Sequence, residues 1–203
     1  MAGITAGMMT ATGIVGMVGG VPIPPAEGTF LGFEAGARLV NPDVEVLVTW
    51  IGSWDDVASA KEAAVAMMRR GADILIHNTD AASFGVFQAV RQARDAGDDV
   101  WAMGMNRDQN DVFPEVILGS AVLRISEAFL TVAQRWRSGQ LPPGEPYFAG
   151  GATRAADYVV NPVLRDRYSS ELRARLEAVR MGIRDGIIDV PRVEFMETGD
   201  SSP

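Results

Sequence analysis

The chain has 203 residues, of which 47% are hydrophobic, and its 18 basic residues against 26 acidic ones give a formal net charge of −8. This length and apolar content suffice for a large hydrophobic core, and the acidic balance excludes a nucleic-acid-binding surface, which needs a basic stripe. Cysteine is absent and there is a single histidine. This argues against a zinc site built from side chains, and we expect no metal.

The first twenty residues are apolar and small, with interrupting glycines and no basic residue. This pattern is typical of neither a secretory signal nor a membrane span. Ala2–Thr10 predicts a short helix that is apolar on nearly every side, and such a helix needs cover on all its faces.

Strands and helices alternate from residue 14 to residue 105. Apolar and β-branched runs predict strands at Ile14–Val18, Val44–Trp50, Ala72–Ile76 and Val100–Met105. Amphipathic stretches bounded by proline, aspartate, asparagine or glycine predict helices at 24–39, 57–70 and 84–96, with Asp55 or Asp56 capping the second. Strands alternating with helices of this length predict a parallel, doubly wound α/β sheet.

The pattern is less regular after Asp111. We expect a further strand at Val116–Leu118, a long helix at Ala121–Arg137, a short strand at Tyr147–Ala149 and a charged amphipathic helix at Tyr168–Asp185.

Polar or aromatic residues follow the predicted strands at the point where each strand ends. In an open parallel sheet, ligands bind outside the carboxyl ends of the strands, where the crossover helices leave a crevice. The candidate ligand-binding residues at this edge are Trp54, Asn78, Asp80, Asn106 and Asp108. The sequence therefore predicts a small-molecule binder.

Each of these residues also has a purely structural interpretation. The Trp54 indole offers a flat face to a planar ligand, or else covers the edge of the sheet. Asp80 reads a ligand, or else caps the helix that begins near Ser83. The run from Asn106 to Gln109 suits a ligand that carries amide or hydroxyl groups, or else is an ordinary polar loop.

The evidence for catalysis is weaker. His77 has the intrinsic pKa of a general base, but no serine or cysteine nucleophile lies in a recognisable elbow, and a histidine at a strand end is more often a packing group. The glycines Gly16, Gly19 and Gly20 do not fit a dinucleotide-binding loop. We therefore expect neither an enzyme nor a cofactor.

Several short motifs, taken in order, resemble the basic membrane protein family. They are FEAG (33–36), NPD (41–43), GSWDD (52–56), GAD (71–73), the strand-end DQ (108–109), LGSAVLRISEAF (118–129) and DGIIDVP (185–191). Each piece alone is weak, but their combination is specific. This family comprises substrate-binding lipoproteins of bacterial ABC importers that take up purine nucleosides and related compounds.

The resemblance implies one lobe of a two-lobed, type I periplasmic-binding-protein-like clamshell that closes on its ligand. It implies that Trp54 stacks on a purine and that Asn106, commonly aspartate in the family, and Asp108 bind the ligand through hydrogen bonds. Leu123 stands where nucleoside-binding relatives have a lysine that looks toward the sugar. A free base such as adenine is therefore favoured over a nucleoside, and the His77–Asp80 run is similar to the base-binding branch.

The resemblance also implies a domain division. Residues 1–12 correspond to an approach or hinge helix, 13–120 to a ligand-binding lobe, and 121–203 to C-terminal helices with a remnant of the other lobe. Family members carry a whole first lobe, a signal and a lipidated cysteine before the segment that matches Ala2–Thr12. We therefore expect Ala2–Thr10 and the segments after Leu141 to leave an exposed apolar patch where that lobe would pack, and we consider a homodimer through it.

The sequence thus predicts the solute-binding component of an ABC importer. Its expected partners are a purine-like ligand and an ABC permease, and the family resemblance implies a periplasmic or membrane-anchored lipoprotein, although no signal or lipobox is visible. The alternatives are a cytoplasmic ligand sensor that reuses the fold and a nucleoside-processing hydrolase acting through Asp80, Asp108 and His77.

Overall fold

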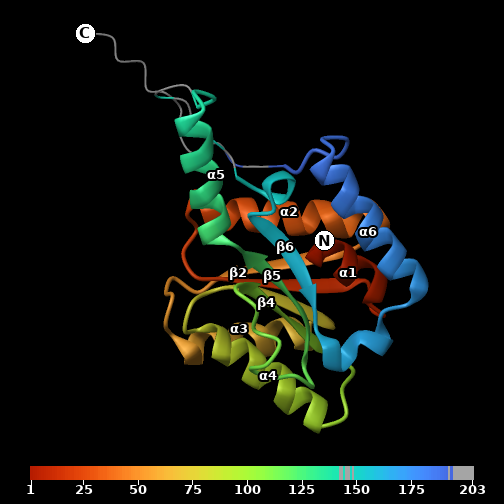
Figure 1. The fold of residues 1–203 in the computed structure, drawn as a ribbon. Coiled ribbons are helices and arrows are strands. Elements are labelled where there is room, and N and C mark those ends of the chain that lie inside the picture. Colours follow the sequence, from red (N-terminus) through yellow and green to blue (C-terminus); the bar gives the residue numbers. More distant parts are fainter. Residues whose placement is uncertain (142–143, 145–146, 148, 192, 194–203) are drawn as a thin grey trace.

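A computed structural model describes residues 1–141, 144, 147, 149–191 and 193. Six strands form one sheet in the order β2-β1-β3-β4-β5-β6 (Figure 1). Their bounds are Ile14–Gly19 (β1), Glu45–Trp50 (β2), Ile74–Asn78 (β3), Trp101–Asn106 (β4), Ile117–Leu123 (β5) and Ala156–Val160 (β6). The strands β1 to β5 pair in parallel, which confirms the predicted fold class, and β6 adds an antiparallel edge next to β5.

Helices cover both faces of the sheet, as a doubly wound fold requires (Figure 1). One face carries α1 (Ala2–Met9), α2 (Pro24–Val40) and α6 (Ser170–Arg184), and the other carries α3 (Val57–Arg69) and α4 (Ser83–Asp95). Each face has its own apolar core, and β3 contributes to both because its side chains alternate. Ile74 and Ile76 join the α1/α2/α6 core, whereas Leu75 joins the α3/α4 core.

The helix α1 confirms the prediction made from its composition. Residues 2 to 7 are all buried, and the helix packs between α2, α6 and the sheet. The exposed apolar patch expected at Ala2–Thr10 is therefore wrong for residues 2 to 7, because this chain itself covers them. Asp56 caps α3 as expected, because its carboxylate accepts the Ser59 backbone N–H at 3.0 Å.

The region after residue 111 differs from the prediction. The strand β5 continues to Leu123, so the following helix, α5 (Ile125–Arg137), begins four residues later than predicted for 121–137. Residues 121–123 stay in the strand because β5 is paired on both of its sides, with Ala121 opposite Met105 of β4 and Tyr158 of β6. The edge strand β6 was not predicted, and the strand predicted at 147–149 includes residue 148, which lies outside the described residues.

The last helix also begins later than its pattern suggests. Residues 162–167 form a 3₁₀ helix, and α6 begins at Ser170 after a cap in which the Ser169 hydroxyl accepts the Leu172 N–H at 3.0 Å. Tyr168 is excluded from the helix because its buried hydroxyl donates to the Leu118 carbonyl at 2.9 Å and bonds the Tyr158 hydroxyl at 2.8 Å. Nowhere in the described part of the chain is a helix both long and apolar enough to cross a bilayer.

Candidate ligand-binding site

The carboxyl ends of β2, β1, β3 and β4 lie next to one another, and we call this line the strand-end edge. Backbone bonds continue the sheet past the strands. The Gly20 N–H donates to the Asn78 carbonyl at 3.0 Å, and the Ile51 N–H donates to the Gly19 carbonyl at 2.9 Å. The edge is therefore fixed by the sheet and does not depend on a loose loop.

Trp54 lies at this edge with its indole against the backbone of Gly20. A Cβ atom on Gly20 would overlap the six-membered ring of the indole, so only glycine allows this approach. The Trp54 carbonyl accepts the Ala82 N–H at 3.1 Å, which ties the turn to the start of α4. Trp54 is half-buried, so it covers the edge and still offers surface to a ligand. Trp50 packs against Phe30, with ring centroids 4.9 Å apart.

Two asparagines meet at the ends of neighbouring strands β3 and β4. The Asn106 Nδ2 group donates to Asn78 Oδ1 over a long 3.5 Å, and Asn78 Nδ2 donates to the Thr29 hydroxyl of α2 at 2.8 Å. Asn78 is 7% exposed, whereas Asn106 is half-buried. A neutral amide presents both a donor and an acceptor, so this pair can recognise a ligand that carries both.

The two aspartates predicted at the edge lie on its exposed side. The carbonyl oxygen of Asp80, and not its carboxylate, accepts the Ser83 N–H and hydroxyl at the start of α4. The predicted capping role of the Asp80 side chain is therefore wrong. The Asp108 carboxylate accepts the Asn110 N–H at 3.0 Å and closes its own loop. The structure thus brings Asn78 and Asn106 together and leaves both carboxylates outside that contact.

His77 is buried on the opposite face of β3, edge-on to Phe87 at 5.2 Å. Its Nε2–H donates to Gln109 Oε1 at 2.9 Å, and its Nδ1 accepts the Thr79 N–H at 3.3 Å. Burial lowers the pKa of His77 to about 4, despite the opposing bonds from Gln109 and Thr79. The ring is neutral near pH 7 and both nitrogens are occupied, which is the packing role and not that of a general base.

Sequence reasoning missed Thr29 and the buried role of Gln109. Thr29 lies on the buried stripe of α2, between Ala26 and Phe33, and its hydroxyl donates to the Ala26 carbonyl at 2.7 Å while it accepts from Asn78. A polar residue at an apolar position of the helical stripe was the available signal. Gln109 stands in the polar run after β4, but it is 5% exposed, and its amide oxygen accepts hydrogen bonds from the buried residues His77 and Met105.

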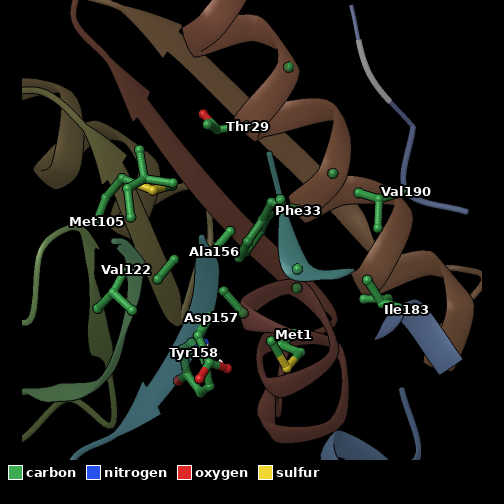
Figure 2. Close-up of a pocket in the computed structure, with 18 of the residues that line it drawn as sticks. Met1, Thr29, Phe33, Met105, Val122, Ala156, Asp157, Tyr158, Ile183 and Val190 are labelled. Carbon is green, nitrogen blue, oxygen red and sulfur yellow. Dashed lines mark hydrogen bonds between the residues drawn. The ribbon is translucent and has the colours of Figure 1, made fainter. Parts of the chain in front are cut away.

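An apolar cavity of about 330 Å³ lies between α2, β5 and β6, and it is linked to the asparagine pair through Thr29, although neither asparagine lines it. Figure 2 shows Met105 and Val122 on one side of it and Ile183 and Val190 on the other. Thr29 and Leu123 also line it. Leu123 thus contributes an apolar wall and no charge. Within the described residues, no three His, Cys, Asp or Glu side chains gather to form a metal site.

An α/β sheet with a polar strand-end edge and an adjoining cavity defines a small-molecule-binding lobe. Comparison with known proteins specifies the family. Residues 1–184 match the family described as ABC transporter substrate-binding protein PnrA-like, abbreviated Bmp, and the chain belongs to it. This confirms the resemblance found in the sequence.

Individual relatives carry two kinds of description. The chain is 29% identical over 181 residues to a purine-binding protein of Brucella abortus, covering 87% of this chain and 49% of that protein. It is 30% identical over 146 residues to the transcriptional activator protein med of Bacillus subtilis, covering 72% of this chain and 44% of that one. Among solved structures, an ABC transporter solute-binding protein of Aeropyrum pernix has the same fold, with a TM-score of 0.76, 22% identity and coverage of 93% and 63%.

The chain spans about half the length of the curated relatives it matches, with 55% and 56% of two of them covered.

Proposed function

We propose that this chain is a ligand-binding lobe of an ABC-importer solute-binding protein, which takes a purine base or a nucleoside-like molecule and performs no chemistry on it. The observation that carries the proposal is the Asn78–Asn106 pair, which lies at the same strand-end edge as the Trp54 indole. Family membership and the purine-binding relative support it.

The chemistry of the edge suits a neutral, planar ligand. An asparagine amide pairs with adenine by donating to one ring nitrogen and accepting from the exocyclic amine, and an indole stacks on the base. Asp80 and Asp108 complete the candidate set on the exposed side of the edge. Leu123, which lines an apolar cavity, favours a free base over a nucleoside because a ribose needs polar partners.

The absence of catalysis is part of the proposal. A hydrolase would need a base near the ligand, and His77 is buried on the other face of the sheet with both ring nitrogens engaged. The proposed partners are a purine-like ligand and an ABC permease, and the proposed location is outside the cytoplasmic membrane, as a periplasmic protein or lipoprotein.

A second folded unit is proposed to pack on α5. This helix buries no residue, and its apolar side chains Phe129 and Trp136 are 72% and 73% exposed. In the domain division predicted from the sequence, α5 belongs with the lobe that longer relatives carry, and a second copy of the chain is the alternative occupant. Sedimentation velocity of the chain distinguishes a dimer from a monomer.

Calorimetric titration with adenine, guanine, adenosine and guanosine tests the binding proposal. We expect adenine to bind most tightly, and Trp54→Ala to weaken binding about tenfold or more because base stacking is lost. Trp136→Ala is the matched control, since it removes an indole far more exposed. Absence of binding by all four compounds, or equal effects of the two variants, would contradict the proposal.

Leu123→Lys tests the preference for a base. Restoring a cation at this position is expected to raise the affinity for adenosine relative to that for adenine. An unchanged ratio would show that Leu123 does not set the choice.

A regulatory role is the second candidate, because one relative is a transcriptional activator. Fractionation of cells that express the native gene separates the two. A protein found in the cytoplasm would favour the sensor, and one found outside the membrane would favour the importer.

A further inference from the structure

Asn106 adopts a conformation that L-residues avoid. Its φ is +69°, and among the described residues the only other non-glycine with a positive φ is Arg154. The Arg107 N–H donates to the Met105 carbonyl at 2.9 Å, so Asn106 is the central residue of a three-residue turn. A γ-turn with positive central φ is rare and strained, and such strain persists only where the surroundings impose it.

The side chain of Gln109 supplies that constraint. Its Oε1 accepts the Met105 N–H at 2.9 Å and the His77 Nε2–H at 2.9 Å. Met105 therefore has its N–H held by Gln109 and its carbonyl held by the turn. Gln109 is 5% exposed and His77 is 1% exposed, so water cannot replace these bonds.

Gln109 is in turn fixed from behind. Its backbone N–H donates to the Ser120 hydroxyl of β5 at 3.0 Å, and that hydroxyl donates to Asn110 Oδ1 at 3.0 Å. The Asn110 Nδ2 group donates to the Val159 carbonyl of β6 at 3.3 Å. One buried network thus joins the strands β3, β4, β5 and β6.

Gly104 makes room for the network. A Cβ atom there would lie 3.1 Å from both Cβ and Oε1 of Gln109 and would press on the Ser120 hydroxyl. A larger residue would displace the amide that holds Met105.

We propose that Gln109 is a positioning residue: by bridging Met105 and His77 it holds Asn106 in the left-handed conformation, and so keeps the Asn106 amide against Asn78. The benefit for ligand recognition rests on the proposed function, but the conformational claim does not. No charged side chain takes part in these bonds, so the turn at Asn106 is held by neutral hydrogen bonds alone.

The test compares Asn106→Ala with Asn106→Gly in two backgrounds. In the wild-type background, alanine pays the left-handed penalty and glycine does not, so we expect the glycine variant to melt roughly 2–4 °C higher. In a Gln109→Met background the turn is released, and this gap should close to within about 1 °C. A Gln109 that only stabilised the fold would lower both melting temperatures equally, and an unchanged gap would overturn the proposal.

Two further measures keep the test decisive. If Gln109→Met does not fold, Gln109→Asn replaces it, because its amide is one methylene too short to reach both donors. In a titration with adenine, Gln109→Met is expected to weaken binding about tenfold while the exposed control Gln88→Met leaves it unchanged. If the wild type does not bind adenine, the proposed ligand fails, and the melting-temperature gap still decides the role of Gln109.

Discussion

The helices α4 and α5 are alike in length and in pattern, but α4 is buried on one face and α5 is exposed. Both have 13 residues, an apolar stripe and arginine in the last turn. The helix α4 buries Val86, Phe87 and Val90 against α3 and the sheet. The helix α5 buries nothing and extends beyond the sheet (Figure 1). An apolar stripe thus specifies that a helix face needs cover, and only the surrounding fold decides whether the same chain provides it.

The largest expected effect comes from the covered helix. Phe87→Ala removes a fully buried ring and should lower the free energy of unfolding by about 3–5 kcal/mol, because a cavity remains. Urea denaturation measures the loss. A loss below about 1 kcal/mol would mean that α4 is no better packed than α5.

Acidification tests the buried ring of His77, which packs against Phe87. The pKa of His77 is about 4 in the folded state against 6.5 for an unperturbed histidine, so between these values the unfolded state binds the proton more readily. The contribution of His77 to the free energy of unfolding is fully present above pH 6.5. It falls by about 3 kcal/mol as the pH drops to 4. Urea denaturation across that range measures the loss.

His77→Gln is the control for this prediction, because glutamine can still donate to Gln109 without titrating. The stability difference between wild type and variant should be constant above pH 6.5 and should change only below it. A difference that does not vary with pH would contradict the burial of a neutral ring.

Loss of a helix cap should have a smaller effect than loss of packing. Ser169 caps α6 through the Leu172 N–H, whereas Arg124 at the start of α5 makes no side-chain cap bond. Ser169→Ala should cost about 1 kcal/mol, and Ser169→Asp, which restores an acceptor, should recover most of it. Thermal unfolding of the two variants measures both changes.

The smallest effect on stability is expected on α5. Phe129→Ala should change the free energy of unfolding by less than about 0.5 kcal/mol, because the ring is 72% exposed. If a second copy of the chain is what covers α5, the same variant should reduce dimerisation, which sedimentation velocity measures. A loss as large as that of Phe87→Ala would show that α5 is packed in the isolated chain.

The local sequence pattern was enough to predict the strands and helices of the first half of the chain. It failed for the later segments, where pairing between strands decides the conformation. The strands before residue 106 are bounded by turns and helices that the sequence marks. Residues 121–123 are apolar and compatible with helix or strand, and their pairing with β4 and β6 settles the choice. The strand β6 is short, and its partner lies far before it in the chain.

The position of the site could be predicted from the sequence, but its side-chain contacts could not. Parallel topology alone places Trp54, Asn78 and Asn106 at one edge, because carboxyl ends of parallel strands meet there. It does not say which way a loop side chain turns, so the exposure of Asp80 and Asp108 could not be foreseen. The contacts of Thr29 with Asn78 and of Gln109 with His77 join residues distant in sequence, and no local pattern encodes them.

The pairing of β5 with β6 makes α5 part of an insertion between two neighbouring strands. Leu123 and Ala156 are cross-strand partners, and the Arg124 N–H donates to the Ala155 carbonyl at 2.7 Å. The chain therefore leaves and re-enters the sheet at a single point. A two-residue Asn-Gly turn would join the two strands as a hairpin, at the cost of α5 and of the 3₁₀ helix Gly151–Thr153, which contacts α6.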